Sequence, residues 1–297
     1  MSNNIAIYGN GLFETDDSYL SDLMNSGVTT MILWSLHVHP NGDLYYNDNL
    51  LVSQGKINFG TGPGQINPNM PADLQKLRTG GVAIILFSIG AGGPPDPTDF
   101  HNIQTLLSTS QGTATLTANF KALAQGMVLD GFDYDCEEDG IEVSTITKLT
   151  QILTPLANQK IITFAPYGVP SENFWLQCMS AIYKAMNQLQ PVRWWNLQVY
   201  GGADPASWID EMKAYIRSNP NNPIGVANPN AFMVPGLEAT SPGTVQQQFA
   251  SWQQSGLGLQ GGFIWNLTEI YQSGSTPKAY ADAIAKGLAS QPMRAAG

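Results

Sequence analysis

The stretch GMVLDGFDYDCEEDG, which runs from Gly126 to Gly140, alternates acidic residues with apolar ones. Successive side chains of a β-strand point to opposite faces, so Asp133, Asp135 and Glu137 share one face. The alternate positions hold Phe132, Tyr134 and Cys136, which suit packing against helices. We therefore predict a strand whose three acids point into the interior of a closed sheet.

Buried carboxylates are costly unless they share protons and hydrogen bonds, and such sharing pushes their pKa values apart. Glu137 is the last of the three and stands at the carboxyl end of the predicted strand. In barrels of parallel strands, that end forms the catalytic face. A relay of acids that ends at Glu137 is a reasonable general-acid device.

The rest of the chain repeats one pattern, in which a short apolar run is followed by a longer amphipathic stretch. We predict strands at Ile5–Tyr8, Thr29–Trp34, Val82–Ser88, Gly131–Asp135, Ile161–Ala165, Trp195–Tyr200, Ile224–Val226 and Gly262–Trp265. We predict helices at Asp16–Ser26, Pro71–Thr79, Thr115–Gln125, Val143–Ala157, Ser171–Leu189, Pro205–Arg217, Thr244–Ser255 and Pro277–Ala289, with Asp16, Ser171 and Asp204 as caps. Eight β–α pairs predict an α/β fold, a single (β/α)8 TIM barrel formed by residues 1–297 as one catalytic domain.

One long insertion, from His37 to Pro68, follows the second predicted strand. It contains HPNGDLYYND, an Asn-Gly turn between alternating residues, which predicts a β-hairpin. We expect Tyr45 and Tyr46 of this hairpin to form a wall of the cleft on which sugars could stack.

Composition and charge limit the classes of partner that the protein could bind. The 297 residues carry a net charge of −10 with only 13 Lys and Arg, which argues against nucleic acid. No apolar window reaches the roughly 18 residues of a membrane span, and no secretory leader precedes the first strand. We expect a monomer that is cytoplasmic, or exported by a route that needs no leader, or trimmed of its leader. Cys136 and Cys178 are expected to be buried free thiols.

At this point the sequence resembles the family 18 glycoside hydrolases, the chitinases and endo-β-N-acetylglucosaminidases. DGFDYDCE matches the family pattern Asp-Gly-x-Asp-x-Asp-x-Glu at all four acidic positions, beginning with Asp130. Further similarity covers nearly the whole chain and lies in LFSIGAGG (Leu86–Gly93), ITFAPYG (Ile161–Gly168), NLQVYGG (Asn196–Gly202) and GGFIWNL (Gly261–Leu267). The Gln-x-Tyr form of the sixth strand points to the smaller members, which lack the inserted α+β domain. Cys136 stands where the family more often has a bulky residue.

The resemblance implies a substrate-assisted mechanism with net retention, one of the known exceptions to hydrolysis by two carboxylates. Glu137 would be the general acid and base, and Asp135 would orient the acetamido N–H. Asp133 would set the protonation of Asp135. Tyr200 would hydrogen-bond the acetamido oxygen. No cofactor is implied, and the expected substrate is chitin or another oligosaccharide of N-acetylglucosamine.

Substrate-binding residues are expected around these four. Gln198 would line the same subsite as Tyr200, and Trp265 would form the floor beneath the sugar. Tyr8 and Tyr167 are expected to stack on sugars or to form walls. Ser88 and Gly90 are expected to allow close backbone packing rather than to take part in chemistry.

Several alternatives remain open. The acids could hold a divalent cation, although alternate strand positions lie about 6.6 Å apart, which makes closure on one ion difficult. His37-x-His39 could bind a metal, but His101 is the only further histidine. Asp130, Glu138 and Asp139 are expected to cap helices or to bind a cation. The protein could also be an endo-β-N-acetylglucosaminidase acting on N-glycans, a lectin-like binding barrel, or an inhibitor or subunit of a larger assembly.

Overall fold

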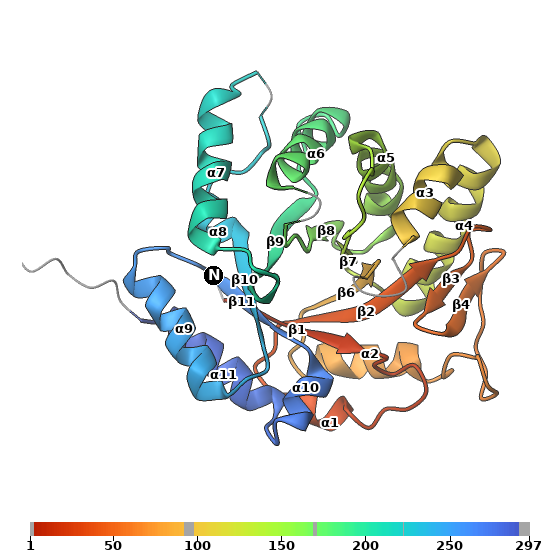
Figure 1. The fold of residues 1–297 in the computed structure, drawn as a ribbon. Helices are drawn as coiled ribbons and strands as arrows, with labels where there is room; N and C mark the ends of the chain where they lie inside the picture. Colours follow the sequence, from red (N-terminus) through yellow and green to blue (C-terminus); the bar gives the residue numbers. More distant parts are fainter. Residues whose placement is uncertain (1–2, 92–97, 169–170, 222, 291–297) are drawn as a thin grey trace, which may run out of the picture.

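The computed structural model describes residues 3–91, 98–168, 171–221 and 223–290. Its centre is a closed barrel of parallel strands, because β1 (Asn4–Asn10) pairs both with β2 (Thr30–Val38) and with the last strand, β11 (Gly261–Trp265). The ring is completed by β6 (Ile84–Ile89), β7 (Gly131–Tyr134), β8 (Ile161–Phe164), β9 (Val192–Gln198) and β10 (Met233–Glu238). The predicted (β/α)8 TIM barrel is confirmed (Figure 1).

Helices follow the strands and surround the ring (Figure 1). They are α1 (Leu20–Leu23), α2 (Met70–Thr79), α3 (Asp99–Leu107), α4 (Ser110–Met127), α5 (Val143–Leu153), α6 (Glu172–Ala185), α7 (Pro205–Ser218), α8 (Pro229–Phe232), α9 (Pro242–Gln254), α10 (Leu267–Gln272) and α11 (Pro277–Leu288). The predicted caps at Ser171 and Asp204 are confirmed, since both side chains accept a backbone N–H of the first helical turn. Asp16 instead accepts the N–H of Ser18 in a turn before the short α1.

The seventh barrel strand differs from the prediction. Residues 224–226, expected to form it, have no strand structure, and β10 takes that place instead. β10 contains Pro235 and Gly236, residues that weaken a strand pattern. Pro235 nevertheless lies in register with Leu197 of β9, so the strand is set by its position between β9 and β11. Helix α3, which follows the Gly- and Pro-rich segment, was not predicted either.

The insertion after β2 is a hairpin, as predicted. β3 (Leu44–Tyr46) pairs antiparallel with the end of β2, and Gly42 in the turn between them has a φ of 84°, which favours glycine. β4 (Asn49–Ser53) and β5 (Lys56–Ile57) extend this sheet outside the ring. From β9 to β11 the described chain forms η2 (Val199–Gly201), α7, α8, β10 and α9, which leaves no room for an inserted α+β domain.

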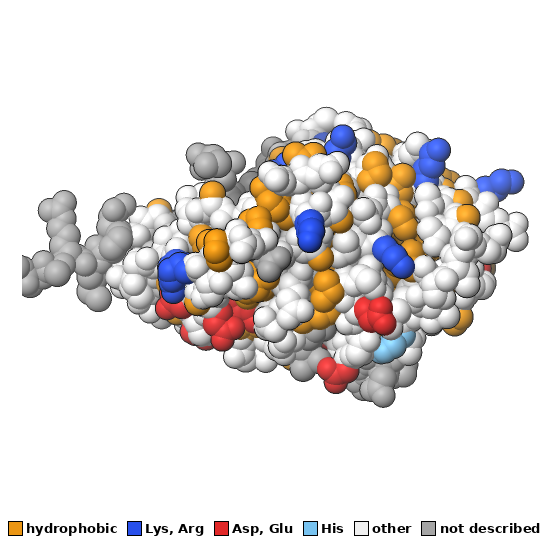
Figure 2. Space-filling view, turned by 90° about the horizontal axis from the view of Figure 1, so that it is seen from above, with side chains coloured by type: hydrophobic (Ala, Val, Ile, Leu, Met, Phe, Trp, Pro, Cys, Tyr) orange, Lys and Arg blue, Asp and Glu red, His pale blue; other side chains and the backbone are white. Residues whose placement is uncertain are grey.

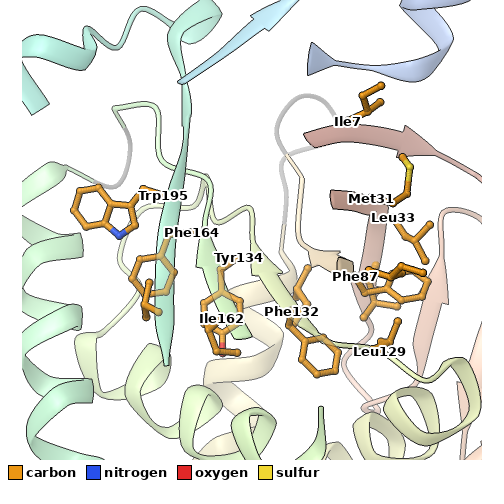
Figure 3. Close-up of a cluster of buried hydrophobic side chains, with 14 of the residues drawn as sticks. Ile7, Met31, Leu33, Phe87, Leu129, Phe132, Tyr134, Ile162, Phe164 and Trp195 are labelled. Atoms are coloured by element: carbon orange, nitrogen blue, oxygen red, sulfur yellow. The ribbon is translucent and has the colours of Figure 1, made fainter. Parts of the chain in front are cut away.

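Apolar side chains pack in two regions on opposite sides of the barrel strands. Outward-facing residues such as Phe132, Tyr134 and Phe164 meet the helices in the larger cluster (Figure 3). Inward-facing residues, including Tyr8 and Phe263, fill the barrel. The alternation predicted for the acidic strand is therefore confirmed. Both cysteines are buried free thiols, as expected.

Charge is sparse on the surface. On the face seen in Figure 2, the Lys and Arg side chains stand apart from one another, and apolar side chains are scattered between polar ones. Among the described residues, no helix is long and apolar enough to cross a membrane.

Candidate active site

The acidic strand β7 lies between β6 and β8 and ends at Tyr134, one residue earlier than predicted, so Asp133 lies in the strand whereas Asp135 and Glu137 follow it. The register of β7 decides which side chains surround Asp133. Asp133 is paired with Ser88 of β6 and with Thr163 of β8. Residues paired across parallel strands share a face of the sheet, so both hydroxyls point into the barrel beside Asp133. The barrel interior thus supplies polar partners at the level of the first acid.

Asp133 is fully buried and accepts four hydrogen bonds. One carboxylate oxygen accepts from the hydroxyls of Tyr8 (2.9 Å) and Ser88 (2.8 Å). The other accepts from the hydroxyl of Thr163 (2.5 Å) and from the amide of Asn196 (3.0 Å). Burial raises the pKa of Asp133, and the four hydrogen bonds oppose that rise. Of the three acids, Asp133 is the one best equipped to keep a negative charge.

Asp135 lies one step nearer the open end of the barrel and is 3% exposed. It accepts hydrogen bonds from the indole N–H of Trp34 (2.9 Å) and from the amide of Gln198 (2.9 Å). Burial raises the pKa of Asp135 well above its ordinary value, and the charge of Glu137 raises it further. Both effects favour the protonated form of Asp135 over the carboxylate.

Glu137 is partly exposed and is hydrogen-bonded to Asp135. The amide nitrogen of Gln198 lies 3.1 Å from its carboxylate and 2.8 Å from the carbonyl oxygen of Ala165. Burial raises the pKa of Glu137, whereas the hydrogen bonds from Gln198 and Asp135 oppose this rise. Glu137 and Asp135 are hydrogen-bonded to each other, so the proton held by Asp135 is shared with Glu137.

Aromatic rings line the barrel mouth beside these acids. Trp265 packs against three of them, with ring centroids 4.8 Å from Trp34, 5.4 Å from Tyr8 and 6.0 Å from Tyr200. Trp34, Tyr200 and Trp265 remain partly exposed. They form an apolar surface facing the carboxyl pair, of the kind on which a sugar ring packs.

Tyr167 and Tyr200 both lie just beyond the end of a barrel strand. Tyr167 follows β8, is partly exposed and packs against Gly201, where an added Cβ would come within 2.8 Å of its ring. Burial raises the pKa of Tyr167, and the charge of Glu137 adds to the rise, so the ring lies close to the pair. Tyr200 belongs to η2 and not to the strand we predicted for it.

Other expected residues have different positions from those we predicted. Tyr8 is 1% exposed and its hydroxyl is bonded to Asp133, so it lies beneath the site rather than in its wall. Ser88 does more than allow packing, because its hydroxyl donates to the same carboxylate. Tyr46 is buried against the carbonyl oxygens of Gly9 and Leu12, which corrects the expectation that it faces the cleft.

Gly90 agrees with its expected role, because it has a φ of 91° and a Cβ there would lie 2.5 Å from the carbonyl oxygen of Asp135. Gly92 and Gly93 of the same motif lie outside the described residues. Sequence reasoning missed Trp34, Thr163 and Asn196. Each of them occupies a position of its own strand whose side chain points into the barrel, and this alternation could have identified them.

The acids beside the central three have structural partners. Asp130 pairs with Arg78 at 2.6 Å and accepts the N–H of Ile85. Glu138 accepts the N–H groups of Phe100 and His101 at the start of α3, while Asp139 is exposed.

The two histidines of the His-x-His pattern also have neighbours. His37 contacts Asp99 at 3.1 Å, and His39 stacks on Tyr45. Within the described ranges, no group of three His, Cys, Asp or Glu side chains is arranged to hold a metal ion.

No protein-family model and no curated protein matches the sequence. Solved structures match along nearly the whole chain. The catalytic domain of a GH18 chitinase from the fern Peteris ryukyuensis is 18% identical, with a TM-score of 0.58 over 96% of this chain and 99% of that one. A fungal endo-β-N-acetylglucosaminidase of family 18 is also 18% identical, with a TM-score of 0.60 over 96% and 98%. The chitinase-like agglutinin of Robinia pseudoacacia is 12% identical, with a TM-score of 0.59 over 95% and 99%. The chain therefore has the barrel fold of the family 18 glycoside hydrolases.

Proposed function

We propose that the protein is a family 18 glycoside hydrolase that cleaves β-1,4 bonds of chitin or chito-oligosaccharides with retention and without a cofactor. The observation that carries the proposal is the graded environment of three alternate acids, with Asp133 in β7 and with Asp135 and Glu137 in the residues that follow it. Asp133 is saturated with donors, Asp135 is buried, and Glu137 reaches the open end of the barrel. Because Glu137 is the most exposed of the three, the proton that it shares with Asp135 can be given to a leaving group at the open end of the barrel.

In the first step, the acetamido oxygen of the substrate attacks the anomeric carbon as the glycosidic bond breaks. Glu137 gives its proton to the departing glycosidic oxygen. Asp135 accepts the acetamido N–H, and this contact favours the charged form of Asp135, which leaves the pair's proton on Glu137. Tyr200 donates to the acetamido oxygen and keeps it aimed at the anomeric carbon, over the floor formed by Trp265.

In the second step, water replaces the leaving sugar. Glu137 removes a proton from this water as the oxygen of the water attacks the anomeric carbon. The bond to the acetamido oxygen breaks, and the oxazolinium ring opens to the free acetamide. Two inversions at one carbon give net retention, and Glu137 regains its proton for the next cycle.

The structural neighbours support this class of activity and define its alternatives. One solved relative is a chitinase and another is an endo-β-N-acetylglucosaminidase. A third is an agglutinin with the same fold. Loops rather than barrel strands distinguish such activities.

The test is incubation with N-acetylglucosamine oligomers beside a high-mannose N-glycopeptide and cellotetraose, with products read by mass spectrometry. We expect di- or trisaccharides from the oligomers and no cleavage of cellotetraose, which lacks the acetamido nucleophile. Release of the glycan, with one N-acetylglucosamine left on the peptide, would instead assign the protein to endo-β-N-acetylglucosaminidases. Oligomer binding without turnover would assign it to the lectins.

The Glu137→Gln variant tests the acid itself. We expect kcat to fall by at least about 10²-fold, because an amide cannot donate the proton, while oligomer binding persists. Glu142→Gln is the matched control, since Glu142 is an exposed glutamate of the same segment. Turnover by Glu137→Gln at the rate of this control would refute the mechanism.

A further inference from the structure

A cavity opens beside Tyr167 at the end of the barrel where Glu137 lies. It has a volume of about 390 Å³ and lies between the N-termini of α6 and α7. These helices follow β8 and β9, so the cavity is on the catalytic side of the barrel. Its lining includes Tyr167, Glu172, Asp204, Trp208 and Glu211. Tyr167 therefore borders both this cavity and the surroundings of Glu137.

The distinctive group in this cavity is the carboxyl of Glu172. Its side chain is 8% exposed, and its Oε1 atom is buried without a hydrogen-bond donor in the described parts of the chain. Glu211 lies alongside it across the gap between α6 and α7. A buried oxygen that lacks a donor is costly, and a ligand that donates a hydrogen bond would relieve that cost.

The charge of the lining decides what kind of donor would bind. Every ionisable side chain among the described lining residues is acidic or phenolic, and none is Lys, Arg or His. Asp204 already accepts the N–H of Ser207 as the cap of α7, which leaves Glu172 and Glu211 for a ligand. Two carboxyls without a third ligand suit an organic cation better than a metal ion, and no three-ligand metal group occurs in the described ranges.

The rings of Trp208 and Tyr167 complete the site, because aromatic faces attract cations. We propose that this cavity binds the protonated amino group of a glucosamine unit, so that the enzyme prefers partially deacetylated chito-oligosaccharides over fully acetylated ones. The inference rests on the proposed function, since it extends that substrate away from the cleaved bond. In this arrangement the leaving-group side of a chain cleaved at Glu137 would extend across Tyr167, which borders both sites, into the cavity.

Binding of an ammonium group has a consequence for protons. Burial, together with the hydrogen bond to Glu211 and the charge of Glu211, raises the pKa of Glu172 to about 9. Glu172 is therefore protonated at neutral pH when the cavity is empty. A cation placed against it favours the carboxylate, so binding of an amine that is already protonated in solution releases the proton of Glu172 to the buffer.

The first experiment measures binding, not turnover. The disaccharides of glucosamine and of N-acetylglucosamine are titrated into the full chain carrying Glu137→Gln, by calorimetry in two buffers of different ionisation enthalpy, at a pH at which the free amine is protonated. We expect proton release with the glucosamine disaccharide alone and about tenfold weaker binding of it when Glu211→Gln is added. Glu211 is exposed, so this substitution should not disturb folding.

Asp210→Asn is the matched control. Asp210 is the neighbouring acid of α7 and pairs with Lys213 on the surface, and its substitution removes the same charge. Equal loss of binding in both variants would reduce the effect to general electrostatics and overturn the inference. Ethylamine binding as strongly as the disaccharide would overturn the assignment to an amino sugar.

Kinetics separate this inference from the proposed function. For tetramers with one glucosamine on the leaving-group side, kcat/KM should exceed that of the fully acetylated tetramer about tenfold, and Glu211→Gln should abolish the preference. An active enzyme without this preference overturns the inference alone. A protein that cleaves no oligomer but still binds the glucosamine disaccharide through Glu211 overturns the proposed function alone.

Discussion

Asp133 is surrounded by donors from four different strands, so its charge depends on residues far away in the sequence. Tyr8 contributes from β1, Ser88 from β6, Thr163 from β8 and Asn196 from β9. Each hydrogen bond stabilises the ionised carboxylate and lowers its pKa. Removing one donor should therefore change the pH dependence of catalysis and have little effect on the fold.

The Tyr8→Phe variant tests this at the scale of a single hydroxyl. Loss of the donor raises the pKa of Asp133, so if Asp133 works ionised, the acidic limb of the kcat/KM profile should move to higher pH. The control is Tyr46→Phe, which also deletes a buried hydroxyl but one that is bonded to backbone carbonyls. An acidic limb that moves equally in both variants, or in neither, would mean that Asp133 does not set this limb.

The residues of the site were only partly accessible to sequence reasoning. Strand alternation correctly placed Asp133 on the inner face of β7. Asp135 and Glu137 follow the strand, and their shared contact with Gln198 shows that they remain on the same side. The partners of these acids depend on the register between strands, which no single segment determines. For that reason Trp34 was overlooked and Tyr8 was expected in the wall, although its hydroxyl lies against Asp133.

At the scale of elements, α3 is held by the loop that carries Glu137. The carboxylate of Glu138 accepts the N–H of Phe100 at 2.7 Å and that of His101 at 2.9 Å, and it contacts the ring of His101 at 2.6 Å. Thr98, at the helix's own N-cap position, makes no side-chain capping bond. An acid from another element therefore caps this helix, and the same contacts fix the backbone next to Glu137.

The Glu138→Ala variant should lower the free energy of unfolding by about 1–3 kcal/mol, because it leaves buried N–H groups without an acceptor. It should also lower kcat, because the backbone beside Glu137 loses an anchor. Chemical denaturation and kinetics of the same preparation measure both effects. Exposed Glu142, substituted in the same way, should change neither, and a Glu138 variant as stable as this control would show that α3 does not need the cap.

Helices and strands were predicted correctly where the local sequence determines them. They were missed where neighbouring elements in the fold determine them. The hairpin after β2 was found because its Asn-Gly turn and alternation lie within a few residues. β10 was missed because its proline and glycine argue against a strand, while residues 224–226 look like one in isolation. The flanking strands override local preference in β10.

At the scale of the whole molecule, stability depends on the layer between the ring and the helices. Phe164 is fully buried there, with its ring centroid 4.5 Å from that of Trp175 and 5.6 Å from that of Tyr134. Phe164→Ala should cost about 3–5 kcal/mol of unfolding free energy through lost burial and the cavity left behind. We expect a single cooperative transition in denaturant, as for one domain.

Leu189→Ala is the comparison for this variant, because Leu189 is 68% exposed and its loss should change stability by no more than about 0.5 kcal/mol. Both variants should keep their catalytic constants under conditions in which they are folded. Two separate transitions, or equal stability of the two variants, would contradict the view that one continuous layer supports the barrel.

The pairing of β1 with β11 also has a consequence for biosynthesis. A ribosome delivers β1 long before β11, so the barrel retains two unpaired strand edges until β11 has emerged. Exposed edges are templates for association with other chains, and contacts so distant in sequence slow folding. The time at which the ribosome completes β11 therefore sets the earliest moment at which the barrel can close.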